Sequence, residues 1–370
     1  MTIKDHYLSI ISGKQHGALP FAVKTFLFSV SCIYRLILKL RSLIYQIGII
    51  KKKKLAVPVI SVGNITTGGT GKTPFIEYIA TYIKGKGINV AILSRGYGAR
   101  TKENETFNDE HLMLTENLKD IPNLMGSDRF KTGNLAIEEY KANCLLLDDG
   151  FQHIRLNRQL DIVLINALNP FGYENILPRG FLREPLKNLN RADMFVITHT
   201  DLCTEEELKA IQERLNKINN QVPVIRSIHQ PLHIKDFKND VTLPMEWLNK
   251  KSVYAFCAIG NPDSFSRLLQ LNSASVIKFK IFEDHYFYEK DDLTVMIKEA
   301  EQMGAEAIVT TQKDKVKILK IVTKDELHAH SIPLCIIKIA IKITEGRETA
   351  EKIIDKTLAT GQVDRLKAEG

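Results

Sequence analysis

The segment SVGNITTGGTGKTPF, residues 61–75, most constrains the fold of this chain. It follows an apolar run, residues 57–62, that is typical of a buried strand, and from Pro74 onward the pattern favours a helix. A glycine-rich turn between a strand and a helix is the setting of a phosphate-binding loop, whose usual pattern is G-x-x-x-x-G-K-[ST]. Thr66 stands where that pattern has its first glycine, and we expect Gly63 and Asn64 to begin the turn earlier.

The residues of this P-loop predict a nucleotide bound with Mg²⁺. Backbone N–H groups and the positive end of the following helix would bind the polyphosphate. Lys72 is expected to reach the β- and γ-phosphates, and Thr73 is expected to bind the metal. The residues expected to bind through the loop backbone are Gly68, Gly69, Thr70 and Gly71.

A second segment, CLLLDDGFQH (residues 144–153), supplies the carboxylates that such a loop requires. Its apolar run ends in Asp148 and Asp149, the arrangement of a Walker B strand. Ligands bind at the carboxyl ends of parallel strands, so both carboxylates would face the P-loop and hold Mg²⁺. The alternative is an aspartate that caps the next helix.

Strand and helix patterns alternate from residue 55 almost to the end, which predicts an α/β fold. We expect a P-loop NTPase-like, doubly wound parallel sheet, followed by a second, smaller α/β domain. The polar stretch 230–250 carries two prolines, and we place the join between the lobes there. The expected division is 1–54 for an N-terminal helix and basic run, 55–235 for the P-loop core, 236–345 for the second lobe, and 346–370 for a closing helix and tail.

Residues 21–50 are densely apolar, but charged residues interrupt them. The longest uncharged run, 25–34, is too short for the ~20 residues of a membrane span. We expect an amphipathic helix in a membrane interface, with the lysine run 51–54 against anionic headgroups. The alternative is a helix packed on the protein core or on another subunit. Under either interpretation, the polar stripe of this helix would contain Lys24, Ser31, Arg35, Lys39, Ser42 and Gln46.

Composition adds two expectations. The net charge of +8 favours anionic partners without choosing one. The five cysteines form no C-x-x-C pair, which indicates neither a disulfide framework nor a zinc site and favours a reducing cytoplasm.

Other short segments have two interpretations when each is taken alone. Asp109 and Glu110 in NDEHLML suit either a helix cap or a catalytic base. Arg179 and Arg183 in LPRGFLREP suit either anion binding or plain surface charge. The segments SRGYG, EDHYF and TTQKDKVK each follow a predicted strand and are equally compatible with a structural role.

Taken in order, these segments and AIGNPDSF resemble the tetraacyldisaccharide 4'-kinase family, from the N-terminus to about residue 345. The resemblance implies transfer of the γ-phosphoryl group of ATP to the 4'-hydroxyl of a tetraacylated glucosamine disaccharide 1-phosphate in lipid A biosynthesis. It also implies a location at the cytoplasmic face of a bacterial inner membrane. In that family the P-loop also lacks its first glycine. We expect a monomer whose partners are this substrate and the membrane surface, and not nucleic acid.

The resemblance also assigns site residues. Asp109 falls on the base candidate of the family's G-D-E-P motif, and His285 falls on the first histidine of its D-H-H motif, which assists that base. Lys72 and Asp149 complete the catalytic set, and Arg183 falls on the arginine of L-R-E-P at the nucleotide. The sequence departs from the family at Asn108, His111, Tyr286 and Gln312, so the alignment of Asp109 is the weakest of these assignments.

Two other functions fit a P-loop chain with an apolar helix. The first is a GTPase or ATPase of the metallochaperone or protein-targeting type. Guanine-specific members carry N-K-x-D, whereas the nearest match here, THTD at residues 198–201, lacks both the Asn and the Lys. The second is a membrane-bound nucleotide sensor without catalysis.

Overall fold

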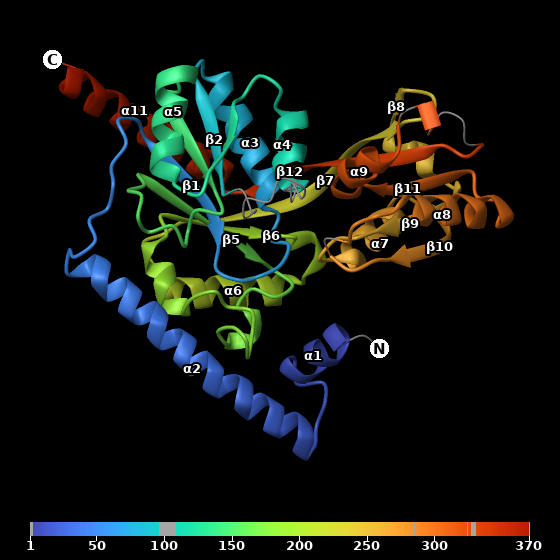
Figure 1. Cartoon of the computed structure of the whole chain (residues 1–370), viewed down its shortest axis with the longest axis horizontal. Coiled ribbons are helices and arrows are strands. Elements are labelled where there is room, and N and C mark those ends of the chain that lie inside the picture. The colour runs from blue at the N-terminus through green and yellow to red at the C-terminus, as the bar shows by residue number, and fades with distance from the viewer. Residues whose placement is uncertain (1–2, 96–108, 285, 324, 327–330, 370) are drawn as a thin grey trace.

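The computed structural model describes residues 3–95, 109–284, 286–323, 325–326 and 331–369. Within them, one large mixed sheet runs through both lobes, with helices on its two faces (Figure 1). The strands are β1 (Val59–Asn64), β2 (Val90–Ser94), β3 (Asn123–Met125), β4 (Cys144–Asp148), β5 (Leu160–Asn166), β6 (Met194–Thr198), β7 (Val224–Asp236), β8 (Val241–Leu243), β9 (Ser252–Cys257), β10 (Ser275–Ile281), β11 (Ala307–Thr311) and β12 (Leu334–Glu345). The α-helices are α1 (Ile3–Ile11), α2 (Ala18–Gln46), α3 (Lys72–Gly85), α4 (Asp109–Asn117), α5 (Arg129–Tyr140), α6 (Glu205–Ile218), α7 (Pro262–Leu271), α8 (Lys290–Gln302), α9 (Gln312–Ile321) and α11 (Arg347–Glu369).

The N-terminal half of the sheet is parallel and doubly wound, as the alternating pattern predicted. Its order is β6-β5-β1-β4-β2-β3, so β1, which leads into the P-loop, lies between β5 and β4. The register pairs Val62 of β1 with Asp148 of β4. The carboxyl ends of these two strands therefore meet at one edge of the sheet, where ligands bind in folds of this kind.

Helices cover both faces of this half. The P-loop helix α3 buries Phe75 and Ile79 against one face, together with residues of α4 and α11. The opposite face is covered by α5 and α6. The C-terminal helix α11 is fixed to α3, since Tyr78 donates to Glu351 at 3.2 Å and Tyr82 to Asp355 at 3.0 Å. It therefore completes the core of the P-loop half.

Two long antiparallel strands connect the halves. β7 pairs with β6 in parallel and with β12 in antiparallel register, and β12 continues to β11, β9 and β10 in parallel. Residues 230–236 belong to β7, so the expectation that the whole stretch 230–250 is irregular is wrong at its start. Pro231 is accommodated at a register shift opposite residues 338 and 339, a position where a strand tolerates a missing N–H.

Helix α2 lies along the outside of the P-loop half (Figure 1). Of the polar stripe, Ser31 is the buried member: its hydroxyl donates to the Ile176 carbonyl at 2.8 Å and accepts from Arg179 N at 3.0 Å. Tyr34 and Leu38 pack against the core, whereas many other apolar side chains are exposed, with Phe26 at 68% and Ile37 at 56%. By length and composition alone α2 is long and apolar enough to cross a membrane, and its placement in a membrane interface stays a prediction.

Candidate active site

The P-loop starts the helix α3 with a backbone turn that glycine favours. Gly71 caps the helix in the left-handed region, with φ of 78°, and Gly68 has φ of 108°. Asn166 donates to the Gly69 carbonyl at 3.0 Å, and Thr198 donates to the Thr70 carbonyl at 3.1 Å. Because the N–H of a trans peptide points opposite to its carbonyl, the N–H groups of residues 70 and 71 face the other side of the loop, where they can bind an anion.

Thr66 has a clear role in place of the missing glycine. Its backbone forms an antiparallel bridge with Leu182, and the next residue, Thr67, donates its N–H to the Phe181 carbonyl at 2.8 Å. The first half of the P-loop is therefore extended and paired with the LPRGFLREP segment. The expectation that Gly63 and Asn64 begin the turn is wrong, because both belong to β1.

Gly63 is required by close packing. A Cβ at that position would lie 2.7 Å from both the backbone N and the Cβ of Phe151. The DDGFQH turn thus approaches β1 so closely that only glycine leaves room. This contact sets the distance between the P-loop strand and the turn that follows the two aspartates.

The two aspartates lie in different environments. Asp148 ends β4 and is 5% exposed. Asp149 follows in a left-handed conformation with φ of 50°, and its Oδ1 lies 3.6 Å from Nζ of Lys72. A non-glycine residue with positive φ is uncommon and points the side chain away from the strand direction. The structure thus brings Asp149 to the P-loop lysine.

Their ionisation differs accordingly. Burial, with Glu110 and Asp149 adding to it, raises the pKa of Asp148 to about 7, against the opposing effect of Lys72. Burial also pushes the pKa of Asp149 upward, but Lys72 and Arg183 outweigh it and hold that pKa below its usual range. The positive charge near Asp148 is therefore too small to offset the burial of its carboxyl group.

A hydroxyl and two carboxylates fit Mg²⁺, an ion that takes one or two protein carboxylates together with substrate phosphates. Thr73, at the start of α3, is 8% exposed and lines the same cavity as Asp149. Within the described ranges no group of three or more His, Cys, Asp or Glu side chains could hold a metal ion. Thr73, Asp148 and Asp149 would therefore need oxygens of the nucleotide to complete a metal site.

The two arginines of LPRGFLREP have separate partners. Arg183 donates from Nη1 to both carboxylate oxygens of Asp149, at 2.9 and 2.8 Å. Arg179 instead donates to the carbonyl of Ile11 at 3.1 Å, so it attaches the N-terminal helices to the core. Of the two, only Arg183 lines the cavity beside the P-loop.

Asp109 begins α4, is 8% exposed and lines the cavity as well. Its two oxygens face lysines of α9, with Lys320 Nζ 3.7 Å from Oδ1 and Lys317 Nζ 3.8 Å from Oδ2. The other candidate of the proton-transfer pair, His285, lies outside the described residues. Its neighbour Asp284 pairs with Lys313 at 3.0 Å on the cavity wall.

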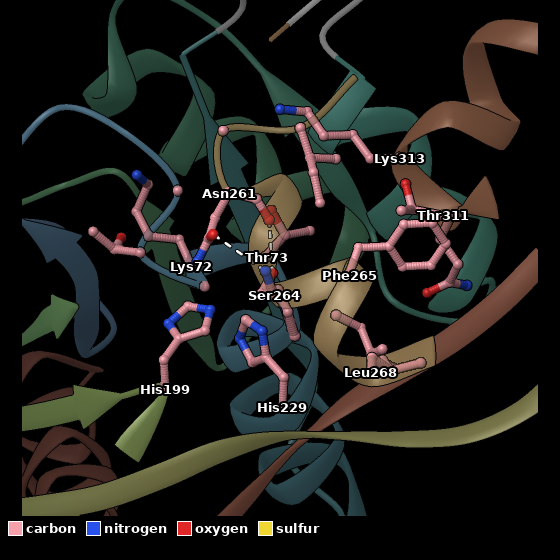
Figure 2. A pocket seen from close by; sticks show the side chains of 18 of the residues that line it. Lys72, Thr73, His199, His229, Asn261, Ser264, Phe265, Leu268, Thr311 and Lys313 are labelled. Carbon is pink, nitrogen blue, oxygen red and sulfur yellow. Dashed lines mark hydrogen bonds between the residues drawn. The ribbon is translucent and has the colours of Figure 1, made fainter. Parts of the chain in front are cut away.

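The cavity has a volume of about 970 Å³ and lies between the P-loop and the second lobe. The cavity is lined by Lys72 and Thr73 together with Asn261 and Ser264 of the second lobe, and by the apolar Phe265 and Leu268 (Figure 2). A Cβ on Gly260 would lie 3.5 Å from the backbone N of Gly69, so the AIGNPDSF segment rests on the P-loop. The second lobe thus covers the phosphate-binding loop.

Two histidines pack under the P-loop at Gly71, and the sequence pattern did not predict them. The rings of His199 and His229 are 4.2 Å apart in an edge-on arrangement (Figure 2). A Cβ on Gly71 would lie 2.5 Å from Nε2 of His229. Burial, with His199 adding to it, lowers the pKa of His229 to about 3. The sequence feature that contains His199 is THTD, which lacks the Asn and the Lys of the guanine motif N-K-x-D.

His153, the last residue of DDGFQH, lies among arginines. Its backbone carbonyl accepts from Arg158 Nη1 at 2.8 Å. Burial and the positive charges of Arg129 and Arg158 lower the pKa of His153 to about 4. The imidazole is therefore neutral at neutral pH.

The family comparison and the curated relatives identify one family. The sequence pattern of the family described as "Tetraacyldisaccharide-1-P 4'-kinase" matches residues 23–359. The chain is 35% identical to the tetraacyldisaccharide 4'-kinase of Halothermothrix orenii, covering 96% of this chain and 98% of that protein. It is 38% identical to the protein of the same name from Desulfotalea psychrophila, covering 83% and 92%. The crystal structure of LpxK from Aquifex aeolicus in complex with ATP superposes with a TM-score of 0.68 at 28% identity, covering 91% of this chain and 99% of that one.

Proposed function

The chain belongs to the tetraacyldisaccharide-1-P 4'-kinase family, and from that membership we propose how its residues carry out the reaction. It is an ATP-dependent kinase that phosphorylates the 4'-hydroxyl of a tetraacylated disaccharide 1-phosphate in lipid A biosynthesis. This sets aside both the GTPase and the nucleotide-sensor alternatives. The site residues, the metal and the membrane contact are the parts that we propose.

One observation supports the mechanism most strongly: a single cavity is lined both by the P-loop and by Asp109. The polyphosphate of ATP would lie on the N–H groups at the start of α3, with Lys72 at the β- and γ-phosphates. The acceptor sugar would then enter from the side of α4. Both reactants would share one water-poor space between the lobes.

We assign Asp109 as the group that accepts the proton of the 4'-hydroxyl. The sugar oxygen forms a bond to the γ-phosphorus while the bond from that phosphorus to the β,γ-bridging oxygen breaks, and ADP leaves. In a loose transition state the proton moves late, so the carboxylate mainly orients the hydroxyl. His285 would assist Asp109 from the second lobe.

Lys72 and Asp149 would act together at the transferred group. The ammonium of Lys72 offsets negative charge on the phosphates, and Asp149 keeps that ammonium in place at 3.6 Å. Arg183, bound to both oxygens of Asp149, would complete the positive end of the site. Thr73, Asp148 and Asp149 would hold Mg²⁺, which when bound neutralises the developing phosphate charge.

We propose that α2 holds the kinase at the cytoplasmic face of the inner membrane. Its exposed apolar side chains, among them Phe26 and Ile37, support contact with lipid, and the lysines of 51–54 would bind anionic headgroups. An acylated substrate stays in the bilayer, so a catalytic site held at the surface shortens its path. We also propose the division into 1–54, 55–235, 236–345 and 346–370, and a monomer that binds no nucleic acid.

The decisive assay incubates the full chain with Mg-ATP and the tetraacylated disaccharide 1-phosphate in detergent. A bisphosphorylated lipid should form, and Lys72→Met should reduce kcat by roughly 10²–10³-fold. Lys84→Met removes a partly exposed ammonium from the other end of the same helix and should leave the rate near wild type. Absence of acceptor-dependent transfer by protein that binds ATP would overturn the function.

A further inference from the structure

Helix α9 of the second half reaches across to the start of α4. Lys317 and Lys320 are one helical turn apart and share a face of α9. Their ammonium groups lie 3.8 and 3.7 Å from different oxygens of Asp109. The carboxylate is therefore held at both ends by an element far away in sequence.

Lys317 is fixed independently of Asp109. It is 5% exposed, its Nζ lies 3.8 Å from Oδ1 of Asp314, and it donates to the Ala258 carbonyl at 3.4 Å. Asp314 in turn accepts from Ala258 N and from the hydroxyl of Tyr288, both at 3.0 Å. This buried framework belongs wholly to the second half, so it holds the lysine through contacts that do not involve Asp109.

Other contacts dock α9 on α4 without touching Asp109. Lys315 pairs with Glu116, and Gln312 donates to Asn117 at 3.4 Å. They show that the contact between the two helices extends beyond the catalytic carboxylate. They also provide a substitution, Lys315→Met, that removes one contact between the helices and leaves both lysines at Asp109 in place.

We propose that Lys317 and Lys320 are positioning residues that fix the carboxylate of Asp109 for the acceptor hydroxyl when the second half is docked. This inference rests on the proposed function, in which Asp109 accepts the proton. A side chain with two rotatable bonds and a cation at each oxygen has one preferred orientation, and a misplacement of about 1 Å at a reacting group can cost 10²-fold in rate.

The experiment measures kcat and KM for Lys320→Met in the full chain, with Lys320→Arg and Lys315→Met as matched variants. Lys320→Met should lower kcat about tenfold with KM for ATP unchanged, because ATP binds on the P-loop side. Lys320→Arg should restore most of the rate, and Lys315→Met should stay near wild type. Lys317→Met leaves Asp314 buried without its cation and can fail to fold, so Lys320 carries the test.

A double-mutant cycle separates positioning from a general structural effect. Asp109→Asn alone should lower kcat by roughly 10²–10⁴-fold, and adding Lys320→Met should cause no further loss. If Asp109→Asn retains the wild-type kcat, the proposed base itself is wrong. If Asp109→Asn is inactive as expected but Lys320→Met keeps its rate, or the two losses multiply, the base stands and the positioning role is overturned.

Discussion

Arg183 donates to both carboxylate oxygens of Asp149, at 2.9 and 2.8 Å, while Lys72 approaches the same carboxylate from the P-loop at 3.6 Å. Asp149 thus contacts two cations that come from different segments of the chain. The arrangement is built from LPRGFLREP, DDGFQH and the P-loop, three segments separated in sequence.

Replacing Arg183 should therefore affect turnover. Arg183→Met removes one of the two charges that keep the pKa of Asp149 low, and we expect kcat/KM for ATP to fall by about 10–10²-fold. Arg183→Lys should retain part of the wild-type kcat/KM, since an ammonium keeps the charge but not the guanidinium geometry. Steady-state kinetics measure the effect. Arg214→Met, which removes an exposed ion pair with Glu174, is the control, and an equal loss there would contradict a local role.

Asp148 should make the metal-free protein less stable as pH rises. Its pKa is raised to about 7 in the folded chain, against a usual value of 3.8. Between these values the unfolded chain loses the proton first, so stability falls as pH increases and the loss is complete above pH 7 or so. Asp148→Asn should raise the free energy of unfolding near pH 8 by on the order of 3 kcal/mol and change it little near pH 4.

Denaturant unfolding in EDTA at both pH values measures this difference. The exposed Asp120→Asn is the control. A gain of the same size at both pH values would contradict the assignment to this carboxyl. With Mg-ATP present, the wild type should be more stable than Asp148→Asn near pH 8, because the metal requires an ionised Asp148.

The exposed apolar side chains of α2 should bind the protein to lipid vesicles. Phe26→Glu with Ile37→Glu introduces two charges on a face that does not contact the protein core. Burying each apolar side chain is worth about 1.5–3 kcal/mol, so affinity for anionic vesicles should fall at least tenfold or so. Activity on detergent-dispersed substrate should persist. Co-sedimentation measures binding, with Val295→Glu on α8 as the control, and unchanged sedimentation of the α2 variant would place the membrane contact elsewhere.

Gly63 should not tolerate even a methyl group. In Gly63→Ala the new Cβ would lie 2.7 Å from the backbone N of Phe151, and backbone cannot rotate away as a side chain can. We expect a loss of roughly 1–3 kcal/mol in the free energy of unfolding. Gly85→Ala, at the end of α3 with no atom within 4 Å of its Cβ position, should cost far less. Equal denaturation midpoints for the two variants would argue against the packing constraint.

Local signals were sufficient for much of the fold. The apolar run that ends in Asp148 predicted β4, because a buried parallel strand leaves a continuous hydrophobic pattern. The glycine-rich turn after β1 predicted the P-loop for the same local reason. The irregular composition of 230–250 predicted no strand there. In the structure β7 continues to Asp236 because it pairs with β12, which is far away in sequence. Long-range pairing of this kind leaves no local pattern.

By itself, the sequence determined the alternation that gives a doubly wound sheet, the phosphate-binding loop and the paired aspartates, since backbone conformation, periodicity and residue chemistry at these positions are local properties. The tertiary structure alone decided what surrounds them. It placed Leu182 beside Thr66, Arg183 on Asp149, and α9 against Asp109. Each of these contacts joins segments that meet only after the sheet has formed, because their position depends on strand order and on the packing of helices across it.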